Sequence, residues 1–135
     1  MKPPRTLVSR LERLARRAAA SSYSPYSRFA VGAAVLAGSG KLYSGANIEN
    51  ASYGLCNCAE RTAIFTAIAA GERKITCVVV YTSTPSATPP CGACRQVINE
   101  FGPHARVISI CDSAQRIDTT LDALLPGAFG PHNLA

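Results

Sequence analysis

Two short apolar segments, at residues 76–82 and 106–111, each follow a segment in which apolar residues recur at helical spacing. Short apolar segments of this kind are typical of strands buried on both faces, and the intervening helices then cover the sheet. We therefore expect a three-layer α/β/α domain around a mixed sheet of about five strands. The expected strands are 28–36, 41–45, 76–82, 106–111 and 116–119, and the expected helices are 5–20, 58–70, 91–101 and 121–125, the last capped by Thr120.

A chain of 135 residues favours a single domain over residues 1–135. The composition, 47% hydrophobic and 16% charged, is that of a globular protein. No apolar segment approaches the roughly 20 residues that a membrane helix needs, and the first residues lack the apolar core of a secretory signal. We therefore expect a cytoplasmic protein with no membrane partner.

The positive charge is concentrated at the N-terminus. The first 17 residues carry a net charge of +5, from Lys2, Arg5, Arg10, Arg13, Arg16 and Arg17 against Glu12. The expected helix 5–20 also carries an apolar stripe at helical spacing, through Leu7, Val8, Leu11, Leu14, Ala15 and Ala18. This pattern favours a docked helix with a solvated basic face, although a weak anionic partner or a targeting role stays open.

The six cysteines fall into two kinds. Cys77 and Cys111 lie at the ends of apolar segments and are expected to be small buried hydrophobic residues. The other four form a CxC, Cys56 to Cys58, and a CxxC, Cys91 to Cys94, at the expected starts of two helices. Helix N-termini favour thiolates, and three thiolates suit zinc while leaving a fourth position for water.

Two other roles for these cysteines have to be considered. A closed structural zinc site would use Cys56 as a fourth ligand, and a redox-active CxxC would use only Cys91 and Cys94. The CxC spacing is unusual for a structural zinc site, and no neighbouring pattern indicates a thioredoxin-like unit. Neither role would use Glu60, which follows Cys58 by two residues. Cys58-Ala59-Glu60 and Pro90-Cys91-Gly92-Ala93-Cys94 together match the signature of the zinc nucleobase deaminases.

Almost the whole chain resembles the small homotetrameric zinc-dependent cytidine deaminases. Besides the two zinc motifs, the matching segments are 26–34, 47–54, 94–98 and 124–129. The resemblance implies that Cys58, Cys91 and Cys94 bind one Zn²⁺ per chain and that Glu60 is the proton shuttle. It implies hydrolytic deamination of free cytidine and 2′-deoxycytidine by a zinc-activated hydroxide, in pyrimidine salvage.

The resemblance also implies the substrate contacts. Asn47 and Glu49 are expected to hold the ribose 3′-hydroxyl, the backbone of Ala59 to contact the pyrimidine edge, and Phe29 to stack on the base. In similar enzymes, residues equivalent to Tyr53 and Phe129 complete the site of a neighbouring subunit, so shared active sites in a homotetramer are expected. Many relatives have a cysteine where this chain has Ala46, which affects only fine nucleoside contacts.

Arg61 and the basic helix each permit a second interpretation. Three thiolates and Zn²⁺ carry a net negative charge, so we expect Arg61 to hydrogen-bond a thiolate rather than to be an ordinary surface residue. A deaminase of RNA or DNA could use the basic helix to bind phosphates. Asn47 and Glu49 argue against a nucleic-acid partner, because a site that binds a free 3′-hydroxyl would reject a continuing chain. His104 and His132 lie beside prolines and are expected to be exposed.

Overall fold

A computed structural model describes residues 3–134 of the chain, so Lys2 of the basic segment lies outside the described residues. Its centre is a five-stranded sheet in the order β2-β1-β3-β4-β5. The strands are β1 Val31–Ala37, β2 Leu42–Ala46, β3 Ile75–Thr82, β4 Arg106–Ile110 and β5 Arg116–Thr120. Strands β3 and β4 are parallel and the other three neighbouring pairs are antiparallel, so the sheet is mixed as expected.

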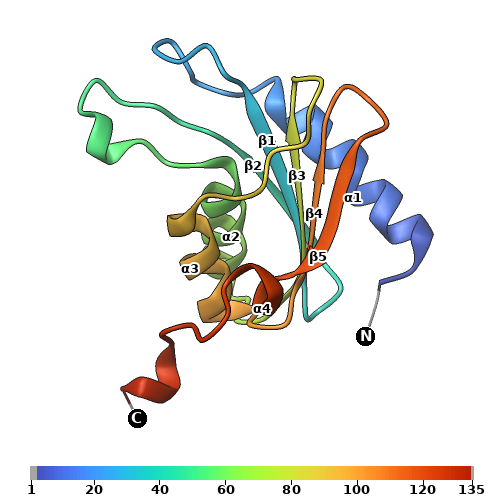
Figure 1. Ribbon diagram of the computed structural model, residues 1–135, viewed down its shortest axis with the longest axis vertical. Helices are drawn as coiled ribbons and strands as arrows, with labels where there is room; N and C mark the ends of the chain where they lie inside the picture. Colours follow the sequence, from blue (N-terminus) through green and yellow to red (C-terminus); the bar gives the residue numbers. More distant parts are fainter. Residues whose placement is uncertain (1–2, 135) are drawn as a thin grey trace.

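Helices cover both faces of this sheet. The α-helices are α1 Arg5–Ala19, α2 Ala59–Ala69, α3 Gly92–Phe101 and α4 Leu121–Leu124, and short 3₁₀ helices span η1 Tyr53–Leu55 and η2 Pro131–Asn133. Helix α1 packs on one face, and α2 and α3 pack on the other, which confirms the predicted three layers (Figure 1). No helix within residues 3–134 is long and apolar enough to cross a membrane.

Two hydrophobic clusters hold the layers together. The cluster under α2 and α3 includes Val78, Ile64 and Ile98, and the cluster under α1 includes Leu11 and Ile108. Successive residues of β3 contribute to opposite clusters because side chains alternate along a strand. The continuous apolar sequence of β3 therefore follows from its burial on both faces. Cys77 and Cys111 are buried as predicted.

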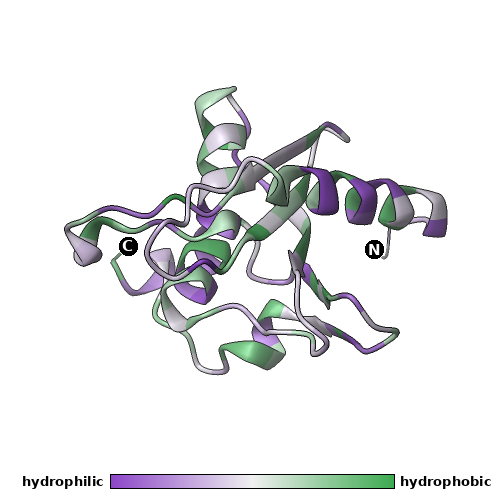
Figure 2. Ribbon diagram, turned by 90° about the horizontal axis from the view of Figure 1, so that it is seen from above, coloured by the Kyte–Doolittle hydropathy of each residue, from purple (hydrophilic) through white to green (hydrophobic). Residues whose placement is uncertain are grey.

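Helix α1 is amphipathic in the predicted sense. Leu11 and Ala15 are fully buried, whereas Arg10, Arg13 and Arg17 are exposed. Figure 2 shows hydrophilic and hydrophobic residues alternating along this helix. The helix lies so close to β1 that a Cβ atom on Gly32 would stand 1.9 Å from the Ala15 carbonyl oxygen.

Element boundaries differ from the predictions where a residue leaves the regular backbone conformation. Strand β1 begins at Val31 rather than at residue 28, because Arg28 has a φ of 56° and cannot continue a strand. Helices α2 and α3 begin one residue later than predicted, because Cys58 and Cys91 are extended N-cap residues. Thr120 stands at the N-cap of α4, but its side chain makes no capping hydrogen bond.

Candidate metal centre

Three cysteines meet where two helices begin. Cys58 is the N-cap of α2, Cys91 is the N-cap of α3, and Cys94 lies in the first turn of α3. Both helices run antiparallel to β3, so both begin at the carboxyl end of that strand. The Cys58 and Cys91 Sγ atoms are 3.8 Å apart, and the Cys91 and Cys94 Sγ atoms are 3.5 Å apart. All three sulfurs lie within 4.8 Å of one another.

The spacing of these sulfurs fits a zinc ion. Tetrahedral zinc with Zn–S bonds of about 2.3 Å places its sulfur ligands about 3.8 Å apart. The three side chains are free thiols, the soft ligands that zinc prefers. Their cluster is therefore compatible with one zinc per chain.

Cys56 stands outside this cluster. Among residues 3–134, the metal-compatible group consists of Cys58, Cys91 and Cys94 alone. The Cys56 Sγ instead accepts a hydrogen bond from the Asn50 backbone N–H at 3.3 Å. A three-cysteine set leaves a fourth zinc position available, as catalytic rather than structural sites do.

Neighbouring donors stabilise negative charge on Cys58. Hydrogen bonding by the Cys94 thiol, followed by the Arg61 guanidinium, lowers the pKa of Cys58 to about 5. The Arg61 Nη2 atom lies 3.3 Å from the Cys58 Sγ. The same hydrogen bond to Cys58, together with burial, raises the pKa of Cys94. The Arg61 Nε is a buried donor with no hydrogen-bond partner among the described residues.

Glu60 is the one carboxylate buried beside the cysteines within residues 3–134. It is the second residue of α2 and is only 5% exposed. Burial raises the pKa of Glu60 to about 7, far above that of an exposed carboxyl group. Such a carboxyl group can both accept and release a proton near neutral pH.

The segment that follows β2 brings Asn47 and Glu49 to the same end of the sheet. Ile48, between them, forms isolated bridges with Tyr23 and with Asn57. The Ile48 N–H donates to the Asn57 carbonyl at 2.9 Å, and the Asn57 N–H donates back at 2.8 Å. Because Asn57 directly precedes Cys58, these bonds tie the predicted ribose-binding residues to the cysteine cluster.

The predicted aromatic contacts are divided between the site and the surface. The carbonyl of Phe29 accepts a hydrogen bond from Asn47 Nδ2 at 2.7 Å, which joins Phe29 to the segment that holds Asn47 and Glu49. Tyr53 and Phe129 are 73% and 59% exposed. The Tyr53 ring lies 5.8 Å from the Tyr26 ring, and the Phe129 carbonyl accepts a hydrogen bond from Gln96 at 2.9 Å.

Ala59 is fully buried at the start of α2. His104 and His132 are exposed, as predicted.

Several polar partners of these residues were not identified from the sequence. Ser27 and the Tyr26 backbone hydrogen-bond the Glu49 carboxylate, and Ser22 donates to Asn47 Oδ1. These serines lie in a turn-forming segment where hydroxyl groups are common. No periodic or spacing signal distinguishes a serine that supports a functional side chain from one that faces water.

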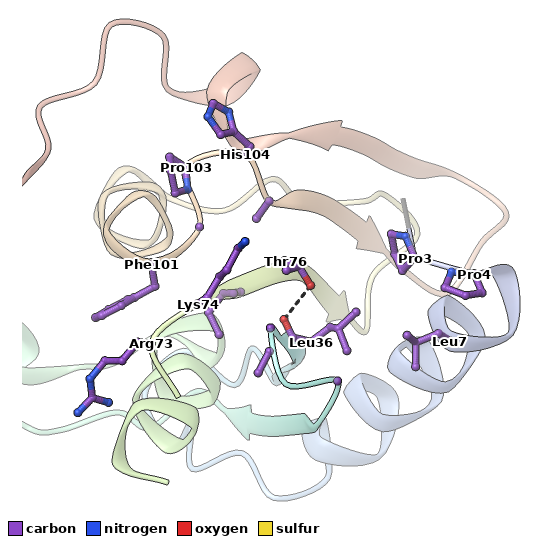
Figure 3. Close-up of a pocket in the computed structure, with 16 residues that line it drawn as sticks. Pro3, Pro4, Leu7, Leu36, Arg73, Lys74, Thr76, Phe101, Pro103 and His104 are labelled. Atoms are coloured by element: carbon purple, nitrogen blue, oxygen red, sulfur yellow. Dashed lines mark hydrogen bonds between the residues drawn. The ribbon is translucent and has the colours of Figure 1, made fainter. Parts of the chain in front are cut away.

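A cavity of about 740 Å³ lies at the opposite end of the sheet from the cysteines. Its walls include Leu36, Lys74, Phe101 and His104 (Figure 3). Helix α3 begins at the cysteine cluster and ends at Phe101, and its 10 residues separate the two places by about 15 Å. The cavity therefore takes no part in the candidate metal centre.

Comparison with known proteins agrees with the geometry of this site. Residues 6–111 match the family model described as the cytidine and deoxycytidylate deaminase zinc-binding region. A cytidine deaminase of Halalkalibacterium halodurans is 50% identical over 109 residues, which are 80% of this chain and 83% of that protein. A cytidine deaminase of Sporosarcina psychrophila is 43% identical over 129 residues, which are 95% of each chain.

Solved structures of cytidine deaminases have the same fold as this chain. A cytidine deaminase from Burkholderia pseudomallei superimposes with a TM-score of 0.86 at 46% identity, covering 90% of this chain and 98% of that one. The enzyme from Mycobacterium tuberculosis gives a TM-score of 0.78 at 39% identity, covering 91% and 97%. With its three-cysteine cluster, this chain belongs to the family of zinc-dependent cytidine and deoxycytidylate deaminases and is a hydrolase.

Proposed function

We propose that the protein hydrolyses the amino group of free cytidine and 2′-deoxycytidine, giving uridine or 2′-deoxyuridine and ammonia, in pyrimidine salvage. The observation that carries this proposal is a buried carboxyl group, Glu60, beside three cysteines at two helix N-termini. The relatives named above, all called cytidine deaminases, support cytidine as the substrate.

In this mechanism Glu60 carries out both proton transfers. Cys58, Cys91 and Cys94 would hold the zinc, which would lower the pKa of a water molecule so that this water can act as the nucleophile. Glu60 takes a proton from that water and delivers it to N3 of the ring. Once the water oxygen has added to C4, Glu60 takes the remaining proton from that oxygen and gives it to the amino group. The C4–N bond then breaks, the C4 carbonyl forms, and ammonia leaves. Burial of Glu60 supports this role because no bulk water competes for the proton.

Arg61 is proposed to keep the centre electrophilic. Three thiolates give the bound metal a net negative charge, which weakens it as a Lewis acid. The Arg61 guanidinium lies 3.3 Å from Cys58 and withdraws charge from that sulfur. The N-termini of α2 and α3 add partial positive charge at the same place.

The remaining site residues are proposed to recognise the nucleoside. Asn47 and Glu49 bind the 3′-hydroxyl, Phe29 stacks on the base, and the backbone of Ala59 contacts the pyrimidine edge. The bridges from Ile48 to Tyr23 and Asn57 support this arrangement, because they fix the ribose-binding segment against the start of α2. A ribose hydroxyl that is bound here must be free, which favours nucleosides over RNA or DNA.

We further propose that the protein is a homotetramer in which Tyr53 and Phe129 complete a neighbouring subunit's site. Tyr53, Leu55, Phe65 and Phe129 are all large apolar residues that are 48% exposed or more. The segment that holds η1 and the C-terminal segment both extend from the side of the molecule that carries α2 and α3 (Figure 1). Exposed apolar surface of this kind is typical of protein interfaces.

The shape and the thiols of the chain support two simpler proposals. One sheet with helices on both faces supports a single deaminase domain over residues 1–135. The cysteines are all free thiols, which is typical of a reducing compartment, so we infer that the protein acts in the cytoplasm.

Zinc analysis and a cytidine absorbance assay on the wild type and on Glu60→Gln test the proposed chemistry. We expect about one zinc per chain in both proteins and a loss of roughly 10²- to 10⁴-fold in kcat for the variant. An active Glu60→Gln protein would contradict the role of Glu60. Turnover of a cytosine-containing oligonucleotide but not of cytidine would contradict the substrate.

Coexpression tests the shared sites. Glu60→Gln and Phe129→Ala chains are each expected to be inactive when expressed alone. In mixed tetramers, activity is expected at sites where Glu60 from a Phe129→Ala chain lies beside Phe129 from a Glu60→Gln chain. The absence of any recovery in a mixed oligomer, or a monomeric wild type in analytical ultracentrifugation, would contradict this proposal.

A further inference from the structure

The segment between α1 and β1 holds the Glu49 carboxylate through both of its oxygens. Glu49 Oε1 accepts hydrogen bonds from the backbone N–H groups of Tyr26 at 2.9 Å and of Ser27 at 3.1 Å. Glu49 Oε2 accepts a hydrogen bond from the Ser27 hydroxyl. The hydrogen bond from Ser27, as the largest cause, lowers the pKa of Glu49, so the carboxylate stays ionised and able to accept.

The direction of the Ser27 hydroxyl proton is fixed by a second contact. The Phe29 backbone N–H donates to Ser27 Oγ at 3.1 Å, which occupies a lone pair of that oxygen and leaves its proton for Glu49. Arg28, between them, has a φ of 56°, in the left-handed region that non-glycine residues rarely adopt. The Arg28 N–H donates to the Ser24 carbonyl at 3.0 Å, which closes this turn. The strained turn therefore brings the Ser27 hydroxyl to Glu49.

The hydrogen-bonding capacity that remains matches one hydroxyl group. A carboxylate offers about four acceptor positions, and the turn uses two on Oε1 and one on Oε2. Asn47 Oδ1 accepts from Ser22 and from the Val31 N–H, and Nδ2 donates to the Phe29 carbonyl. Within residues 3–134 this leaves one acceptor position on Glu49 Oε2 and one donor hydrogen on Asn47 Nδ2. A hydroxyl group needs one donor and one acceptor of this kind.

We propose that the Ser27 hydroxyl is a positioning group that fixes the Glu49 carboxylate, so that Oε2 accepts the hydrogen bond from the 3′-hydroxyl of the nucleoside. This inference rests on the function proposed above, in which Glu49 and Asn47 bind that hydroxyl. Ser27 touches Glu49 and not the reacting atoms, so its loss weakens substrate binding and leaves the chemical step intact.

Two substrates that differ only in the 3′-hydroxyl test this proposal. The measured quantity is the ratio of kcat/KM for 2′-deoxycytidine to kcat/KM for 2′,3′-dideoxycytidine, on the zinc-loaded full-length enzyme. Loss of a hydrogen bond to a charged group changes an equilibrium roughly tenfold. Ser27→Ala is therefore expected to lower the ratio about tenfold, through a higher KM for 2′-deoxycytidine and with kcat changed less than about threefold.

Matched variants separate this role from a general effect on the fold. Ser27→Thr keeps the hydroxyl and is expected to keep the ratio, and Ser27→Cys, a weaker donor, gives an intermediate value. Ser21→Ala is the control, because Ser21 is exposed and its hydroxyl makes no hydrogen bond within residues 3–134, so the ratio should not change. Combining Ser27→Ala with Glu49→Gln should lower the ratio no further than Glu49→Gln alone.

Each failure has its own signature. If Ser27→Ala lowers kcat/KM equally for both substrates, or for neither, while Glu49→Gln lowers the ratio, the role of Ser27 is overturned and the proposed ribose contact stands. If Glu49→Gln leaves the ratio unchanged, the ribose contact fails and the inference fails with it. Absence of cytidine turnover in the wild type would overturn the proposed function itself.

Discussion

The zinc-binding end of this site and its proposed nucleoside-binding end are built in different ways. Two regular helices, packed against the central sheet, place the three cysteines: Cys58 and Cys91 are their N-caps, and Cys94 lies in the first turn of α3. Glu49 and Phe29 lie in irregular segments and are held by side-chain and turn hydrogen bonds. The metal ligands therefore depend on the core, whereas the proposed nucleoside contacts depend on a few exposed polar hydrogen bonds.

Removal of a buried zinc ligand should produce the largest effect. Cys94 is fully buried, so Cys94→Ala is expected to abolish zinc binding and reduce activity below detection. Metal analysis and the cytidine assay measure both. Cys56→Ser is the matched control, since Cys56 lies outside the sulfur cluster and its loss should leave zinc in place. Retained zinc in Cys94→Ala, or lost zinc in Cys56→Ser, would break the comparison at its zinc-binding end.

Arg61→Ala should have the next largest effect. The guanidinium hydrogen-bonds Cys58, and loss of such a partner costs about 10- to 100-fold in metal affinity or turnover. Competition with a zinc chelator measures the zinc affinity, and steady-state kinetics measure the turnover rate. Arg61→Lys keeps the charge without the planar donor group and should recover only part of the loss. Wild-type zinc affinity and rate in Arg61→Ala would remove Arg61 from the mechanism.

At the proposed nucleoside-binding end, Phe29→Ala should raise KM and leave the zinc content unchanged. Loss of stacking between an aromatic ring and a base weakens binding roughly tenfold. Zinc content should not change, because Phe29 lies outside the sulfur cluster. Phe29→Tyr keeps the ring and should behave like the wild type. Zinc loss in Phe29→Ala would show that the two ends are not separable.

The smallest effect is expected far from both ends, at Glu72. Its carboxylate accepts hydrogen bonds from Ser39 at 2.6 Å and Tyr43 at 2.8 Å, and these, Ser39 first, lower its pKa. A folded-state pKa below the unfolded value adds stability at neutral pH, which is lost as pH falls through the lowered pKa. Glu72→Gln should therefore melt slightly below the wild type at pH 7, with the difference closing toward pH 3. Zinc content and KM should not change. An unchanged difference at every pH would contradict this role of Glu72.

Much of the fold was predictable because its signals are local. The strands predicted at 76–82 and 106–111 agree with the observed bounds of β3 and β4 to within one residue at each end. They were recognisable because a strand buried on both faces has a continuous apolar sequence. The amphipathic spacing of α1 predicted its buried face in the same way. The start of β1 was wrong by three residues because nothing in the sequence marks Arg28 as left-handed.

The cysteines and the carboxylate at the starts of α2 and α3, and so the capacity to hold zinc beside an acid, could be read directly from the sequence. The contact of Cys58 with Cys91, 33 positions away, and that of Ser27 with Glu49, 22 positions away, exist only in the folded chain. Helical spacing and strand alternation repeat within a few residues and are written in the local sequence. Contacts between residues so far apart in the sequence depend on sheet order and turn geometry, and these form only when the whole core packs.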